Sequence, residues 1–113
     1  MEKKLKTMKI NGLSANYGIA KGKVVYIKAV EDVSKVQNGD IVITDKITSE
    51  YTEAFMKSGG VISARGGITC HAAIICREQA KPCIVACADA FDLFKEGQQV
   101  EVDTKNLIFS VTA

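Results

Sequence analysis

The residues best suited to chemistry lie between Gly66 and Glu78, where the chain has its only histidine. His71 follows paired glycines, Gly66 and Gly67, and stands at the start of a helical pattern. The first turn of a helix has unpaired backbone N–H groups and partial positive charge. Glycines let the backbone approach a phosphate closely. Neutral imidazole has a free ring nitrogen that can attack a phosphoryl group and hold it covalently. The pattern therefore predicts a phosphohistidine site at His71.

Two polar residues immediately precede this histidine. The hydroxyl of Thr69 could cap the helix, hydrogen-bond the imidazole or donate to a bound phosphate, and these roles are compatible. The thiol of Cys70 would stand at a helix N-terminus, where cysteines are sensitive to oxidation, although packing is the simpler role for it. We expect the phosphate to be positioned by Gly66, Gly67, Thr69 and Cys70.

From Gly66 to Glu78 the chain reads Gly-Gly-x-Thr-Cys-His-Ala-Ala-Ile-Ile-x-Arg-Glu, with Pro82 following. This run resembles the signature of the phosphohistidine swivelling domain of phosphoenolpyruvate (PEP)-utilising enzymes. In motif it is most similar to phosphoenolpyruvate synthase and pyruvate phosphate dikinase, and the cysteine before the histidine is similar to the synthase branch. The resemblance covers roughly residues 10–111, because it extends to Leu13–Gly22, Gly39–Val42 and Glu96–Asp103.

Several positions depart from the family pattern. Ala80-Lys81 stands where Gly-Ile usually precedes the proline, and Ala86 stands where a glycine is common. Asn106 replaces the usual turn glycine of the last hairpin. Asparagine tolerates the positive φ that such a turn requires. None of these changes removes a reacting group, so the expected chemistry is unaffected.

The resemblance implies a division of labour between domains. An ATP-grasp-type nucleotide-binding domain would phosphorylate His71, and a PEP/pyruvate-binding barrel or another acceptor would exchange the phosphoryl group. Mg²⁺ and ATP or PEP are expected on those partner domains, with no cofactor or metal bound here. The resemblance also implies regulation at Thr69, because relatives of the dikinase and synthase type are phosphorylated at the matching threonine, where added negative charge opposes transfer. Because Met1 begins shortly before the first motif, we favour a stand-alone carrier acting in trans, incomplete as an enzyme, over an excised domain.

Other functions stay open at this point. The chain could be a catalytically silent binding or regulatory module with the same fold, or a small swivelling subunit of a dehydratase-type enzyme. Neither would need a nucleophile at His71. A redox or metal protein is a further alternative because the chain has four cysteines. However, no Cys-x-x-Cys pair is present, and the Cys83-x-x-x-Cys87 spacing is weak evidence for zinc.

Composition sets wider limits. The chain has 113 residues with 47% hydrophobic and 25% charged content, which is ordinary for a soluble domain, and we expect residues 1–113 to form a single domain. A net charge of +2 gives no electrostatic reason to expect nucleic-acid binding. No apolar run suggests a membrane span or a signal peptide, so we expect a cytoplasmic protein. Lysines in residues 1–9 suggest a polar, solvated N-terminal arm.

Hydrophobic patterns predict strands mixed with a few helices, and so a compact α/β domain. The family resemblance sharpens this to the swivelling β/β/α architecture. In the second helix we expect Ile74 and Ile75 to face the sheet, with Ala72 and Ala73 on the opposite side. The expected strands are 23–28, 40–44, 61–64, 83–86, 99–103 and 107–111, and the expected helices are 48–57, 70–80 and a turn at 88–94.

Overall fold

Strand β3 (Ile19–Ile27) joins two differently paired parts of the sheet in the computed structural model, which describes residues 4–112. Its first half pairs antiparallel with β7 (Gln99–Asp103), and its second half pairs parallel with β4 (Ile41–Thr44). Gly22 lies just before the change of partner, where an added Cβ would come within 2.2 Å of the Gly39 carbonyl oxygen. Glycine therefore lets the segment before β4 pack directly on β3.

The strands follow the order β1-β8-β7-β3-β4-β5-β6-β2. The remaining strands are β1 (Lys4–Lys9), β2 (Leu13–Asn16), β5 (Gly60–Ser63), β6 (Cys83–Val85) and β8 (Ile108–Thr112). Helices and turns are η1 (Val30–Lys35), η2 (Ser49–Tyr51), α1 (Thr52–Lys57), α2 (His71–Glu78) and α3 (Ala90–Leu93). Within the described residues, none of these helices is long and apolar enough to cross a membrane.

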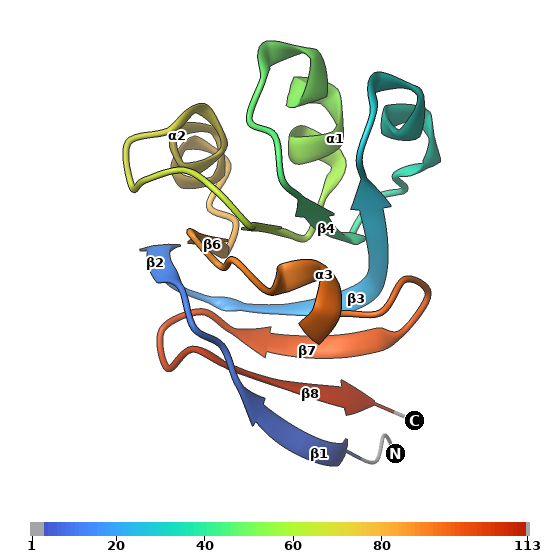
Figure 1. Ribbon diagram of the computed structural model, residues 1–113, viewed down its shortest axis with the longest axis vertical. Helices are drawn as coiled ribbons and strands as arrows, with labels where there is room; N and C mark the ends of the chain where they lie inside the picture. Colours follow the sequence, from blue (N-terminus) through green and yellow to red (C-terminus); the bar gives the residue numbers. More distant parts are fainter. Residues whose placement is uncertain (1–3, 113) are drawn as a thin grey trace.

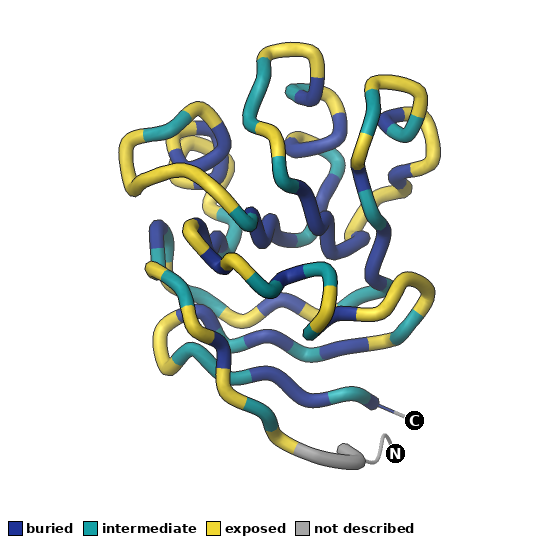
Figure 2. Tube along the Cα trace, in the orientation of Figure 1, coloured by how far each residue is buried: buried dark blue, intermediate teal, exposed yellow. Residues whose placement is uncertain are grey.

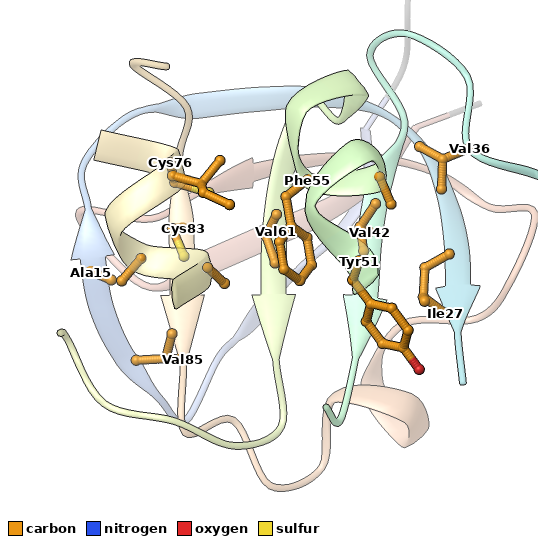
Figure 3. Close-up of a cluster of buried hydrophobic side chains, with 14 of the residues drawn as sticks. Ala15, Ile27, Val36, Val42, Tyr51, Phe55, Val61, Cys76, Cys83 and Val85 are labelled. Atoms are coloured by element: carbon orange, nitrogen blue, oxygen red, sulfur yellow. The ribbon is translucent and has the colours of Figure 1, made fainter. Parts of the chain in front are cut away.

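Figure 1 shows three layers, with η1, α1 and α2 over one face of the parallel strands, and β7, β8 and β1 below the other. One buried cluster lies under the helices and includes Phe55, Val61 and Cys76 (Figure 3). A second cluster lies between the two strand layers and includes Ile43, Phe94 and Phe109. The expected β/β/α architecture is confirmed, since each sheet face buries apolar side chains against another layer.

Most predicted elements occur at the expected places. The helix expected at 48–57 begins as η2 and continues as α1, and the side chain of Thr48 caps it by accepting a hydrogen bond from the Glu50 amide. The terminal hairpin forms from β7 and β8. The sequence patterns gave no indication of β2 or η1, which are short and follow no clear hydrophobic period.

The expected N-terminal arm is wrong for residues 4–9, which form β1 and pair antiparallel with β8. Residues 1–3 lie outside the described part of the chain. Pairing needs only backbone groups, and edge strands commonly carry lysines that discourage further association. Side chains alternate as a strand requires, because Thr7 and Lys9 are exposed while Met8 packs partly against the second core cluster.

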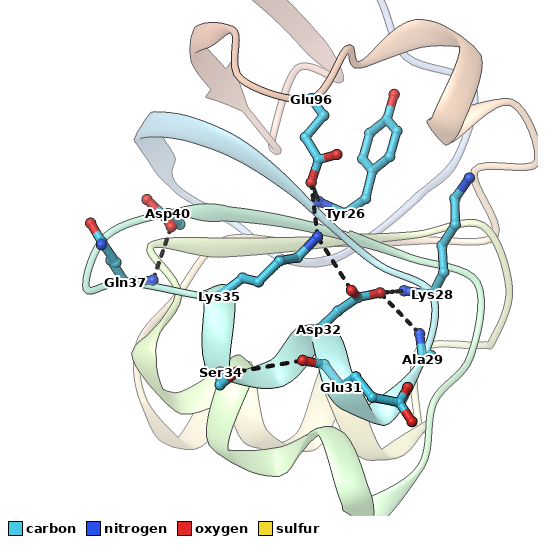
Figure 4. Close-up of polar contacts among 10 residues, drawn as sticks. All are labelled: Tyr26, Lys28, Ala29, Glu31, Asp32, Ser34, Lys35, Gln37, Asp40 and Glu96. Carbon is cyan, nitrogen blue, oxygen red and sulfur yellow. Dashed lines mark hydrogen bonds and ion pairs between the residues drawn. The ribbon is translucent and has the colours of Figure 1, made fainter.

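Asp32 fixes the turn that leads from β3 into η1. Its carboxylate accepts hydrogen bonds from the backbone amides of Lys28 (2.9 Å) and Ala29 (3.1 Å), as Figure 4 shows. The bond from Lys28 is the main reason why the pKa of Asp32 lies below its usual value. Lys35 also pairs with Asp32 (3.3 Å) and Glu96 (3.4 Å). These pairs are half exposed and contribute little stability, so the backbone contacts matter more.

Helix α2 ends in a Schellman motif that has alanine where glycine is usual. The Lys81 amide donates to the Cys76 carbonyl (2.8 Å), and the Ala80 amide donates to the Arg77 carbonyl (3.3 Å). Ala80 therefore takes a φ of 54°. Ala86, the other departure from a family glycine, has a φ of 55°, while in the last hairpin Leu107, not Asn106, adopts the positive φ of 55°.

We expect Ala80→Gly to stabilise the fold by about 1 kcal/mol, because the left-handed conformation strains alanine more than glycine. Ala80 is exposed, so no buried contact is lost. The matched control is Gln79→Gly one residue earlier, where φ is −96° and glycine brings only extra chain entropy. Urea unfolding checks both variants, and equal changes in the free energy of unfolding would contradict the expectation.

Candidate functional site

Helix α2 begins at His71, directly after the loop that leaves β5. Cys70 is the N-cap residue, with extended backbone angles, and its carbonyl accepts a hydrogen bond from the Ile74 amide (3.0 Å). Its side chain makes no capping hydrogen bond, so amides of the first turn stay available. Thr69 is exposed in the loop and is not the cap. Of its three suggested roles, capping is therefore wrong.

The buried face of α2 differs from the expected one. Ala72 and Ala73 are fully buried against the sheet, whereas Ile74 is 46% exposed. Ile75 packs inward as expected. The two alanines are small enough to let the helix lie close to the strands. His71 and Ile74, on either side of them in the sequence, therefore lie on the outer side of the helix. His71 itself is exposed at this outer side, and Figure 2 shows buried and exposed segments alternating along α2.

Thr52, at the start of α1, holds the imidazole of His71. Its Oγ1 lies 2.9 Å from His71 Nε2 and also donates a hydrogen bond to the Ser49 carbonyl (2.8 Å). A hydroxyl has one hydrogen to donate. With that hydrogen on Ser49, Oγ1 can accept a hydrogen bond from Nε2–H. No sequence pattern indicated this contact, because the two residues are 19 positions apart on different helices.

A pocket of about 620 Å³ opens beside the imidazole, at the carboxyl ends of β4 and β5. Ligands commonly bind at this edge of parallel sheets. Of the predicted site residues, His71, Gly66 and Cys70 line the pocket, while Gly67 and Thr69 do not. Sequence reasoning missed the other lining residues, which are Asp45, Lys46, Ile47, Thr48 and Arg65.

The two glycines before the helix have different structural requirements. Gly66 has a φ of 93°, and an added Cβ would lie 2.5 Å from Ile47 Cδ1 and 3.1 Å from Cys70 Sγ. Only glycine fits there without strain. At Gly67 an added Cβ would meet nothing within 4 Å. The fold therefore requires Gly66, whereas Gly67 leaves open space through which a ligand can approach the backbone.

Comparison with known proteins agrees with this geometry. Residues 36–106 match the family described as "PEP-utilising enzyme, mobile domain". The chain belongs to this family. A probable phosphoenolpyruvate synthase of Methanothermobacter thermautotrophicus is 38% identical over 102 residues, which make up 90% of this chain but 15% of that protein. The chain thus spans a small part of the length of such relatives.

Solved structures support the fold of the mobile domain. An Enzyme I structure (nEIt) is 27% identical with a TM-score of 0.58, and the match covers 70% of this chain and 33% of that one. Holo-aconitase X of Thermococcus kodakaraensis has a TM-score of 0.64 at 14% identity, over 92% of this chain and 98% of that one. At such low identity the second likeness shows the fold alone.

Arg77 ties the site loop of this mobile domain to β2. Its Nε donates to the Ala15 carbonyl (3.0 Å), and its Nη2 donates to the Ile68 carbonyl in the loop before His71. Both partners are therefore backbone carbonyls, one in β2 and one in the loop. The planar guanidinium can reach both carbonyls at once, which the single ammonium of lysine cannot do with the same geometry.

Replacing Arg77 with lysine is expected to lower the free energy of unfolding by about 1 kcal/mol. Lysine cannot donate to the Ala15 and Ile68 carbonyls with the same geometry, and the position is largely exposed. Amide hydrogen exchange should increase in residues 66–70, since Ile68 loses its tether. Lys57→Gln provides the control, because its ion pair with Glu53 (3.2 Å) is on the exposed side of α1. Unchanged exchange in the loop of the Arg77 variant would contradict the tethering role.

The cysteines of the mobile domain are free thiols, and three of them are buried. Contact with the Cys76 thiol, together with burial, raises the pKa of Cys83. Burial also raises the pKa of Cys87 to about 12. These two thiols therefore stay protonated near neutral pH and pack as small apolar groups. Across residues 4–112, no three His, Cys, Asp or Glu side chains form a group that could hold a metal ion.

Proposed function

We propose that this chain is a phosphoryl carrier that accepts the phosphoryl group on a ring nitrogen of His71. One observation carries the proposal: the histidine of the family signature is exposed at the start of α2, held by Thr52, and faces an open pocket. A histidine kept only for packing would be buried and would have no need of a pocket. The nearby glycine loop and the uncapped helix start support binding of an anion.

In the proposed step, the lone pair of one ring nitrogen attacks phosphorus. The N–P bond forms as the bond from phosphorus to the leaving oxygen breaks, and that oxygen keeps the electron pair. The proton on the other ring nitrogen stays in place. The reverse step delivers the phosphoryl group to an acceptor. Gly66, Gly67, Thr69 and Cys70 would position the phosphoryl oxygens by shaping the loop and the first helical turn.

We propose that the donor and acceptor sites lie on other domains. The proposed sites are a nucleotide-type site of the ATP-grasp class and a PEP/pyruvate-type barrel, which would bind Mg²⁺ and ATP or PEP. The proposal is supported by a relative named as a probable phosphoenolpyruvate synthase, of which the matched region is 15%, because such a protein has room for further domains. Such a carrier would work in the cytoplasm, where these substrates occur. Thr69 is exposed two residues before His71, so a phosphate on its hydroxyl would repel an incoming phosphoryl group and could regulate the site.

The test is mass analysis of the protein purified from its native cells, under alkaline conditions that preserve phosphohistidine. We expect one acid-labile phosphoryl group, and peptide fragmentation should assign it to His71. An acid-stable phosphate on Thr69 would instead indicate regulation of the same site. If His71 remains unmodified even after incubation with ATP-grasp and barrel partners, the silent binding module becomes the better explanation.

A further inference from the structure

Two neighbouring strands end in matching turns beside His71. Thr44, the last residue of β4, pairs in register with Ser63, the last residue of β5, and both side chains are fully buried. Thr44 Oγ1 accepts a hydrogen bond from the Lys46 amide (3.2 Å), and Ser63 Oγ accepts one from the Arg65 amide (3.1 Å). Each hydroxyl therefore fixes a basic residue two positions beyond the end of its strand.

Further backbone contacts hold both basic residues in place. The Thr44 hydroxyl also donates to the Lys46 carbonyl (3.0 Å), while the Arg65 carbonyl accepts a hydrogen bond from the Ala86 amide (3.2 Å). The two residues line the pocket that contains His71, and both are exposed. Within residues 4–112, neither cationic head has a hydrogen bond or ion pair. Among the described residues, these two charges therefore have no partner.

We propose that Lys46 and Arg65 bind the phosphoryl oxygens while the group is transferred to and from His71. This inference rests on the proposed carrier function. Phosphoryl transfer is limited by charge neutralisation and positioning, so cations fixed near the reacting atom lower the barrier. The guanidinium of Arg65 can donate to two oxygens at once, and the ammonium of Lys46 adds a point charge. Both are positioning residues, because the bond forms at the imidazole.

Asp45 lines the same pocket, and its negative charge should oppose phosphoryl transfer to His71. Its Oδ1 is buried and has no hydrogen-bond partner. A carboxylate at this position repels an incoming phosphoryl group, so its removal should speed transfer if electrostatics control the step. Removal of the Asp45 charge and removal of the Lys46 or Arg65 charge are therefore expected to change the rate of His71 phosphorylation in opposite directions.

The experiment measures the rate of His71 phosphorylation by phosphoramidate, followed by ³¹P NMR. In this reaction the imidazole–phosphorus bond forms, the P–N bond of the donor breaks, and ammonia leaves with the electron pair. We expect Lys46→Gln and Arg65→Gln each to slow loading about tenfold, less than for a fully enclosed oxyanion site because the pocket is open. Asp45→Asn should be a few-fold faster. Arg65→Lys should recover part of the lost rate.

Lys95→Gln is the control for loss of one positive charge, because Lys95 is exposed in the turn before β7, outside the residues that line the His71 pocket. It should load within about twofold of the parent rate, since solvent screens distant charges. Circular dichroism and thermal unfolding should match among all variants. Equal loading rates for the parent and the cation variants would refute the role of Lys46 and Arg65 while leaving the carrier function intact. Failure of the parent protein to load His71 would refute both.

Discussion

Replacement of His71 by alanine is expected to abolish phosphoryl loading completely while leaving the fold intact. Among the side chains that line the pocket, the imidazole offers a free nitrogen lone pair, whereas the nitrogens of Lys46 and Arg65 are cationic, so neither should substitute for it. His71 is exposed, and its described hydrogen bond is the one to Thr52, so the free energy of unfolding should change by no more than about 1 kcal/mol. Alkaline mass spectrometry after incubation with phosphoramidate measures the loading.

Thr69→Ala is the matched control, because it removes the other exposed candidate acceptor two residues away. This variant should still gain one acid-labile phosphoryl group, although more slowly, because Thr69 is proposed to help position the phosphoryl oxygens. Thermal unfolding of both variants separates loss of chemistry from loss of structure. Persistent acid-labile loading in the His71 variant would refute the assignment of the acceptor.

Substitution of Gly66 by alanine should have the largest effect on stability among the loop positions, with a loss of about 2–4 kcal/mol. Two costs combine in this estimate. Alanine is strained at a φ of 93°, and its Cβ would lie 2.5 Å from Ile47 Cδ1 and 3.1 Å from Cys70 Sγ. The loop can relieve these contacts only by moving the residues that line the pocket. We therefore expect slower phosphoryl loading as well as a lower free energy of unfolding.

Gly67→Ala is the adjacent comparison, since its Cβ would meet nothing within 4 Å. Its stability should stay within about 0.5 kcal/mol of the parent, as for most surface substitutions. If phosphate approaches the backbone at this open position, the added methyl should slow loading without weakening the fold. Denaturant unfolding and phosphoramidate loading of both variants provide the two measurements. A Gly66 variant as stable as the Gly67 variant would contradict the steric argument.

Sequence patterns were sufficient to predict those features of the structure whose cause lies within a few residues of the chain. Thr48 caps the first helix because its hydroxyl reaches an amide two residues later, and the helix break before Pro82 follows from the backbone of proline. Tertiary packing decided the N-terminal segment, because an edge strand such as β1 depends on the presence of β8. Packing also decided which face of α2 is buried, since the alanines fit closer to the sheet than Ile74.

From the sequence came the prediction that His71 is the phosphoryl acceptor, together with its position after paired glycines at a helix start and within the signature of a known family. Only the tertiary structure brought Thr52, Lys46 and Arg65 to that histidine. The reason is physical. Parallel pairing of β4 and β5 aligns two strand ends that are 19 residues apart, and no local pattern reports which strands will pair.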